Sequence, residues 1–327
     1  MKPQFVIATL IGLVALSAPG LAKMKSSLRT DQVRGVYELP KDAKQKSIYD
    51  ALKERRTLEE LRILLSPLRL PRRLTLRLKG CDGKIDVSYA DDLVTFCYEY
   101  VEYLQRQAPT IGTPGGLTPA DAIFSAVFDT FLHEAGHAVF DMLKVPIFGR
   151  EEDAADYFSA YILLRFAPDD ARRFIQGVAF IYASEAKVTL EKTPDIEAFA
   201  NEHGLPAQRY FNVLCIAYGS DSKIYEKAIT RGGLPIERAA DCDDEYKMLQ
   251  RAFRKLIRPN VDQALLRTAR AKVRIKWDEL VPPTATRDAL PFALLPDRAS
   301  DILAPRRKNC VILNLCDSVG FARFDVQ

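Results

Sequence analysis

Hydrophobic residues recur at helical spacing along most of the chain, which predicts a mainly helical protein. Between residues 42 and 65, charged positions separate the apolar ones, as in an amphipathic helical segment. A long helix is predicted after Thr118, which can cap it, with Pro119 at the first helical position and an apolar stripe that reaches Met142. Further helices are predicted at residues 151–166, 169–186, 206–217 and 246–277, with a break at Pro259.

A different pattern precedes the long helix. Leu74, Leu76 and Leu78 alternate with polar residues, which is typical of a half-buried strand. The sequence therefore predicts an α+β fold that is mainly helical and contains a small antiparallel sheet. The remaining elements expected here are short strands at residues 85–89 and 93–97, a helix near residues 98–107 and a loop at residues 108–117.

Residues 1–22 have the features of a secretory signal peptide. Lys2 precedes an apolar run, and the small residues Gly20 and Ala22 stand just before the predicted cleavage site. The run is too short to cross a bilayer comfortably, so no stable membrane span is expected after cleavage. No cysteine follows the cleavage site, which argues against a lipoprotein. We expect the mature protein in the periplasm or secreted.

The composition is that of a globular protein. Of the 327 residues, 48% are hydrophobic, which is enough to bury a sizeable core. The formal net charge of +4 is too small to imply binding to nucleic acid. We expect one domain at residues 23–282 and, because prolines are frequent beyond it, a Pro-containing C-terminal tail at residues 283–327.

Six cysteines are present, and in an exported protein an even number favours disulfides. Six cysteines allow about fifteen pairings. Cys81 and Cys97 flank a predicted hairpin, and Cys215 and Cys242 flank a predicted helix and loop, so these two pairs are expected to form bonds. This assignment leaves Cys310 and Cys316 as a local pair. A thiol metal site is not predicted, because the sequence has no C-x-x-C motif.

Two of the three histidines stand in one turn of the long helix, in the motif His133-Glu134-x-x-His137. Residues four apart differ by about 40° around a helix axis, so both imidazoles can bind one metal ion. Zinc with two imidazoles and a third protein ligand keeps one position for water, and Glu134 would act as the general base toward that water. The alternative is a pair of partly buried structural histidines.

The third ligand is expected from the next predicted helix. Glu152 and Asp156 are one turn apart, so Glu152 can bind the metal while Asp156 accepts a hydrogen bond from a ligand histidine. Asp153 and Asp156 are alternative ligands. Glu151 is explained by the helix dipole alone.

Together, the histidine motif and the following Gly149-Arg150-Glu151-Glu152-Asp153-Ala154-Ala155-Asp156 resemble a bacterial putative metallopeptidase family of uncharacterised function. The site pattern of that family is similar to that of the gluzincins. The metzincin pattern is excluded, since Phe140 and Leu143 replace its glycine and third histidine. The resemblance covers about residues 58–277 and implies a zincin-like domain, in which the sheet lies over the active-site helix and its edge can bind extended substrate. Its further matches are at Cys81 and at residues 95–99, 202–203, 208–210 and 215–221.

His203 is the histidine outside the motif, and the resemblance includes it. A hydrolase of this kind usually needs a hydrogen-bond donor for the negative charge on the carbonyl oxygen, and His203 is the predicted donor. Tyr157, Arg209 and Tyr210 are competing donors, and a simple surface position for His203 is the alternative.

The predicted function is zinc-dependent hydrolysis of peptide bonds in the bacterial envelope, with a peptide or protein as substrate. Two alternatives remain open. One is an exported protein in which zinc only joins two helices and catalyses nothing. The other is a zinc amidase that acts on cell-wall peptides.

Overall fold

The computed structural model describes residues 32–107, 117–191, 194, 196–230 and 233–278. The predicted signal peptide, the C-terminal tail, the Cys310–Cys316 pair and nearly all of the predicted loop at residues 108–117 lie outside the described residues. As expected, the fold is α+β, mainly helical and with one small sheet.

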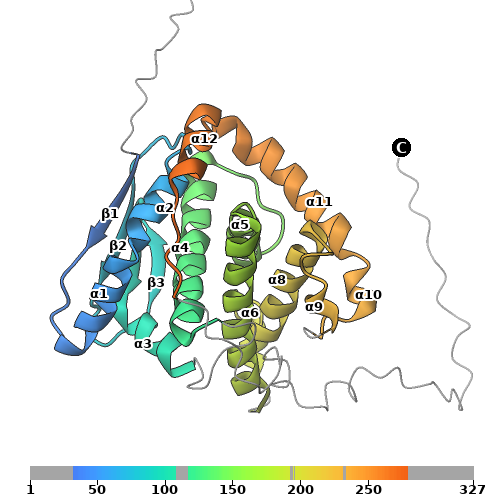
Figure 1. Cartoon of the computed structure of the whole chain (residues 1–327), viewed down its shortest axis with the longest axis horizontal. Helices are drawn as coiled ribbons and strands as arrows, with labels where there is room; N and C mark the ends of the chain where they lie inside the picture. The colour runs from blue at the N-terminus through green and yellow to red at the C-terminus, as the bar shows by residue number, and fades with distance from the viewer. Residues whose placement is uncertain (1–31, 108–116, 192–193, 195, 231–232, 279–327) are drawn as a thin grey trace, which may run out of the picture.

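A four-stranded mixed sheet forms one side of the domain (Figure 1). Its strands lie in the order β1-β2-β4-β3, so β3 is an edge strand. The inward face carries Leu74, Leu76 and Leu78, all fully buried, and Phe96 of this face stacks on Phe131 at 4.6 Å between ring centroids. The strands are β1 (Val33–Tyr37), β2 (Leu74–Lys79), β3 (Val87–Ala90) and β4 (Leu93–Cys97).

The expectation of an antiparallel sheet was wrong for two of the three strand pairs. Only the β3–β4 hairpin is antiparallel, whereas β1–β2 and β2–β4 are parallel. The chain between β1 and β2 passes through α1 (Lys46–Glu54) and α2 (Thr57–Leu65), and such a helical crossover lets the second strand run in the same direction as the first. The sequence pattern missed β1, a short strand with two exposed residues.

Helix α4 (Pro119–Leu143) is the centre of the helical layer. It packs against the sheet on one side and against α5 and α6 on the other. Its start matches the prediction, because the Thr118 hydroxyl accepts a hydrogen bond from the Asp121 amide at 3.0 Å. The other helices are α3 (Tyr98–Gln107), α5 (Glu151–Leu163), α6 (Pro168–Glu191), α7 (Ile196–Ala200), α8 (Pro206–Ser220), α9 (Lys227–Thr230), α10 (Ile236–Ala239), α11 (Cys242–Ala252), η3 (Phe253–Ile257), η4 (Arg258–Asn260) and α12 (Gln263–Lys272).

Both disulfides predicted within the described residues are present. Cys81–Cys97 joins the turn after β2 to the end of β4, with the Cα atoms 5.5 Å apart. Cys215–Cys242 joins α8 to the start of α11, with the Cα atoms 5.0 Å apart. Among the described helices, none combines the length and the apolar character needed to cross a membrane.

Helix α6 crosses α4 closely at Gly177. A Cβ atom at this position would lie 2.5 Å from Ser125 Cβ and 3.2 Å from Ala122 Cα. Alanine normally favours a helix over glycine by about 1 kcal/mol, but real Cβ atoms do not approach other atoms so closely. We expect Gly177→Ala to lower the free energy of unfolding by about 1–3 kcal/mol, measured by urea denaturation.

The control for this prediction is the same substitution in a Ser125→Gly background, which removes the nearest side chain. There Gly177→Ala should cost clearly less than in the wild-type background. Equal costs in the two backgrounds would show that the crossing does not depend on contact between these residues.

Candidate metal centre

Helix α4 fixes the two histidines of the motif. Residues on all sides of the helix are buried, and His133 itself is 4% exposed. The rings of His133 and His137 lie 4.9 Å apart between centroids, and both contact residues of α5. A buried and closely packed helix holds such side chains in place better than a loop would.

Helix α5 brings the acidic residues to the histidines. It begins after Gly149, whose positive φ of 96° suits the chain reversal between the two helices. Gly136, inside the histidine motif, allows α5 to approach, since a Cβ there would lie only 3.3 Å from Phe158 and 3.4 Å from Ala155. The close contact sets the distance from the histidines to Glu152 and Asp156.

Four atoms of three residues converge between the two helices. His133 Nε2 lies 3.0 Å from a carboxylate oxygen of Glu152 and 3.2 Å from His137 Nε2, and His137 Nε2 lies 3.5 Å from the other oxygen of Glu152. Zinc bonds of about 2.0–2.1 Å in a tetrahedral site place neighbouring ligand atoms about 3.3 Å apart. The observed separations therefore fit a single small metal ion.

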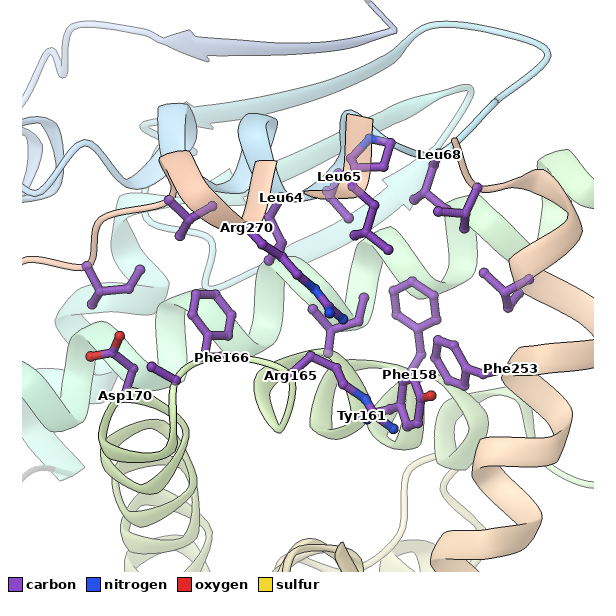
Figure 2. Close-up of a pocket in the computed structure, with 18 of the residues that line it drawn as sticks. Leu64, Leu65, Leu68, Phe158, Tyr161, Arg165, Phe166, Asp170, Phe253 and Arg270 are labelled. Atoms are coloured by element: carbon purple, nitrogen blue, oxygen red, sulfur yellow. The ribbon is translucent and has the colours of Figure 1, made fainter. Parts of the chain in front are cut away.

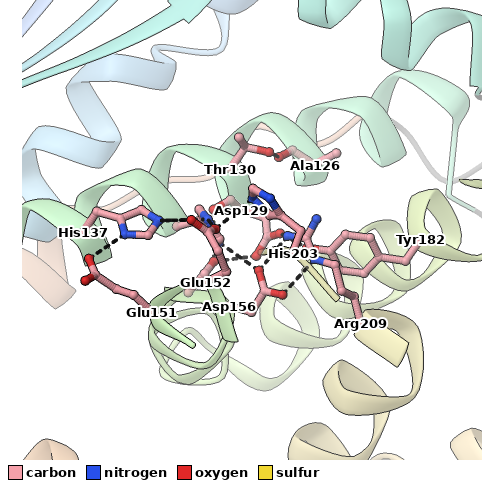
Figure 3. A network of polar contacts seen from close by, with 12 residues as sticks. Ala126, Asp129, Thr130, His137, Glu151, Glu152, Asp156, Tyr182, His203 and Arg209 are labelled. Atoms are coloured by element: carbon pink, nitrogen blue, oxygen red, sulfur yellow. Dashed lines mark hydrogen bonds and ion pairs between the residues drawn. The ribbon is translucent and has the colours of Figure 1, made fainter. Parts of the chain in front are cut away.

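The outer nitrogens of both rings contact carboxylates. His133 Nδ1 lies 2.8 Å from Asp156, and His137 Nδ1 lies 2.9 Å from Glu151 (Figure 3). When each imidazole is neutral and its Nδ1–H donates a hydrogen bond to the carboxylate, each Nε2 carries only a lone pair. Two lone pairs and the Glu152 carboxylate then face one another without a proton between them, and a cation is the partner that satisfies all three.

The charges of the protein groups also favour a cation here. Burial opposes ionisation of Glu152, but hydrogen bonds with His133, His137 and His203 outweigh it and hold the pKa of Glu152 well below its usual range. Burial similarly opposes charging of His133, yet hydrogen bonds to Asp156 and Glu152 raise its pKa to about 9. The position between these residues therefore attracts a proton or a metal ion.

Arg209 of α8 holds Asp156 in place. Its guanidinium donates two hydrogen bonds to the Asp156 carboxylate, at 2.8 and 2.6 Å, and lies 4.5 Å from the centre of the Tyr182 ring. Burial alone would raise the pKa of Asp156, but Arg209 and His133 outweigh it and lower the pKa. Asp156 is therefore oriented toward His133 Nδ1 and can accept a hydrogen bond from it.

A cavity of about 390 Å³ opens beside the histidines. His133, Glu134 and His203 line it, together with residues 85–87 next to and within the edge strand β3. Burial raises the pKa of Glu134, so its carboxylate binds a proton more readily than an exposed one would. The cavity thus lies between the sheet edge and the histidine helix.

The cavity also contains acidic groups that the sequence did not reveal. Asp129 stands one turn before His133, and burial raises its pKa to about 6 although a hydrogen bond from Ser159 opposes the shift. Glu185 of α6 lines the same cavity and accepts a hydrogen bond from Tyr103 at 3.2 Å. Only the i, i+4 spacing of Asp129 and His133 could have indicated either of them.

His203 reaches the centre although it is distant in sequence. Its Nε2 lies 2.8 Å from Glu152, its ring stacks over His133 at 6.0 Å between centroids, and its side chain is 44% exposed. His133, Glu152 and His203 also form a group whose ligand atoms lie within 4.8 Å of one another. His203 is therefore placed either to contact a substrate in the cavity or to approach the metal.

The competing donors have other surroundings. Arg209 lines the cavity but is paired with Asp156. Tyr210 is 1% exposed and is not part of the cavity lining, and Tyr157 lines a different hollow together with Phe140. Of the four candidate hydrogen-bond donors, His203 is the one that both lines the cavity and has an exposed side chain without a fixed arginine–carboxylate pair.

Two acidic residues of α5 differ from their sequence-based interpretation. Glu151, explained there by the helix dipole, contacts His137 as Asp156 contacts His133. Asp153, an alternative ligand, points to Arg150 instead and forms an ion pair at 2.8 Å. The rotation of α5 about its axis decides both outcomes, and a run of consecutive acidic residues does not reveal it.

A helix with two histidines one turn apart, and a carboxylate supplied by the next helix beside an open cavity, are the features of a metallopeptidase. Residues 37–257 match the model of a protein family described as "Putative metallopeptidase", and the chain belongs to that family. All residues of the candidate centre lie within the match. The family implies a metal ion without identifying it. Comparisons with curated proteins and with solved structures give no match.

We expect one metal ion per chain, with His137→Ala and Glu152→Ala losing most of it because each removes a donor from the set. Metal analysis of the dialysed protein measures this. Glu151→Gln, which removes only the partner of His137, should weaken zinc binding by about 10–100-fold in a chelator competition.

Asp153→Ala is the matched control, since Asp153 is the neighbour of Glu152 but is directed to Arg150. It should retain the metal. Full metal content in Glu152→Ala, together with loss in Asp153→Ala, would show that the ligand has been misassigned.

Proposed function

We propose that this protein is an exported zinc metallopeptidase that hydrolyses peptide bonds by metal-activated water. The observation that carries the proposal is the convergence of two imidazole nitrogens and a carboxylate beside an open cavity with Glu134 on its wall. His133, His137 and Glu152 would hold zinc. Zinc bound by this donor set would lower the pKa of a coordinated water toward neutrality.

Glu134 would accept the proton of the attacking water. Its carboxylate lines the cavity, and burial raises its pKa toward the range in which a general base both accepts and returns a proton. The neutral glutamine side chain has nearly the same shape but cannot take up a proton. Glu134 therefore differs in role from Glu152, whose pKa is held low and whose carboxylate faces the histidines.

His203 would donate a hydrogen bond to the carbonyl oxygen of the scissile bond. Its ring is partly exposed on the same cavity as Glu134. A donor in this position stabilises the negative charge that develops on the oxygen as the carbonyl carbon becomes tetrahedral. Asp156 and Arg209 would act indirectly, by fixing the ring of His133.

Strand β3 would bind an extended peptide. It pairs with β4 on one side and is the edge of the sheet on the other, and residues 85–87 line the cavity. Main-chain groups of an edge strand can pair with a substrate of any sequence. Two disulfides and the predicted signal peptide support a periplasmic or secreted location.

Glu134→Gln should keep the metal and lose about 10²–10⁴-fold in turnover, because it removes the base but none of the ligands. The measurement is release of new amino termini from a mixed peptide library, with metal content determined on the same samples. A metal-loaded wild-type protein that releases no amino termini from peptides or from cell-wall muropeptides would instead support the zinc-stabilised, non-catalytic alternative.

His203→Ala should lower kcat by about 100-fold or more while metal content and the folded circular dichroism spectrum stay unchanged. Glu202→Ala, at the exposed neighbouring position, is the control and should retain normal turnover. Loss of metal in His203→Ala would identify His203 as a ligand. Normal kcat with normal metal content would remove it from the reaction.

A further inference from the structure

A second cavity, of about 460 Å³, lies between α2, α5 and the C-terminal helices. None of its lining residues lines the metal-centre cavity. Its walls are mainly aliphatic and aromatic, and Figure 2 shows Leu64, Phe158 and Phe253 among them. Its volume is within the range of about 300–1,000 Å³ that is usual for sites that bind small molecules.

An arginine-lined hollow adjoins this cavity. The hollow has a volume of about 340 Å³ and shares Tyr161, Phe253 and Leu266, among other residues, with the apolar cavity. No carboxylate lines it, and Arg165 and Arg270 line both spaces (Figure 2). Its four arginines are Arg165, Arg254, Arg258 and Arg270.

These four guanidinium groups have no carboxylate partner among the residues that the structure describes. Arg55, Arg72 and Arg209, by contrast, each form an ion pair. The cations of the hollow also repel one another, a cost that a bound anion would remove.

The acidic residue of the apolar cavity is already engaged. Asp170 accepts a hydrogen bond from the indole nitrogen of Trp277 at 2.8 Å, and Figure 2 shows it at the end of the cavity away from Phe253. Asp170 does not line the hollow, and among the described residues it forms no ion pair with the four arginines there. The apolar cavity therefore has mainly nonpolar walls, whereas the hollow beside it is exposed and positively charged.

Arg165 is held in place for a ligand at the boundary. Its guanidinium lies 4.3 Å from the centre of the Tyr161 ring and donates a hydrogen bond to the Tyr246 hydroxyl at 2.8 Å. These contacts fix the plane of the group without neutralising its charge. A planar guanidinium with free N–H groups can donate two parallel hydrogen bonds to a phosphate or carboxylate.

We infer that the apolar cavity and its arginine-lined hollow bind a single-chain amphiphile with a phosphate headgroup. The acyl or alkyl chain occupies the space among Leu64, Phe158 and Leu266, and the phosphate lies between Arg165 and Arg270. Apolar burial holds the chain, and charge-assisted hydrogen bonds hold the headgroup. This site is separate from the metal centre and does not depend on the proposed peptidase activity.

The test is isothermal titration calorimetry of the full-length mature protein with decyl phosphate, kept below its micelle concentration. We expect decyl phosphate to bind at least about tenfold more tightly than 1-decanol, which lacks the charge, and at least about 100-fold more tightly than inorganic phosphate, which lacks the chain. Trp277 is the single tryptophan of the chain and bonds to Asp170 of the cavity, so its fluorescence gives an independent reading.

Arg270→Gln should weaken decyl phosphate binding by about tenfold and leave 1-decanol binding within about twofold, since it removes only the charge. Arg267→Gln is the matched control on the same helix, because Arg267 lines neither space, and it should bind as the wild type does. Leu266→Trp, which fills the cavity, should weaken both ligands. Should that variant fail to fold, Arg270→Gln decides alone.

Three results would overturn the inference. They are the absence of decyl phosphate binding, equal affinities for decyl phosphate and inorganic phosphate, and unchanged affinity in Arg270→Gln. Absence of decyl phosphate binding would mean that the cavity does not accept a free amphiphile. Equal affinities for decyl phosphate and inorganic phosphate would leave a simple anion site in the hollow.

Discussion

The close packing of α5 against α4 at Gly136 is the contact on which the candidate metal centre depends. With a larger residue at this position, the helices would have to separate by several tenths of an ångström or Phe158 would have to move. Distances between ligand atoms in a small metal site tolerate little such change. The same contact brings the acidic start of α5 beside both histidines. One glycine therefore serves both the packing of the core and the geometry of the site.

When both imidazoles are neutral, as metal ligands must be, negative charge is in excess around the candidate centre, and this excess distinguishes it from a set of ordinary buried histidines. Glu151, Glu152 and Asp156 all contact imidazoles, while Arg209 is the cation that pairs with Asp156. Buried charges are costly unless they are paired. A divalent ion between the histidines and Glu152 would offset the remaining charge, which links the stability of this region to metal binding.

Local sequence was sufficient to predict the parts of the site that lie within one helix. His133, Glu134 and His137 are fixed relative to one another by helix geometry, and the Thr118 cap and Pro119 gave the start of that helix correctly. The disulfide pairs followed from their positions around predicted elements.

Long-range features were not predictable in the same way. The parallel pairing of β1 and β2 depends on how α1 and α2 cross over the sheet. The contact of Arg209 with Asp156 joins residues 53 positions apart, and the contact of Glu151 with His137 depends on the rotation of α5. No local pattern contains this information, because it arises only when separate elements pack together.

The two cavities relate differently to the family to which the chain belongs. The match to the family ends at residue 257, so it includes every residue of the candidate metal centre but stops before η4 and α12. Arg258 and Arg270, half of the arginines around the hollow, lie beyond it. The segment that carries them is held to the domain by main-chain hydrogen bonds from Arg69 to Asn260 and from Asp262 to Pro67, next to α2. Membership of the family therefore supports the metal chemistry alone, and the arginine-lined hollow must be judged from its own charges and shape.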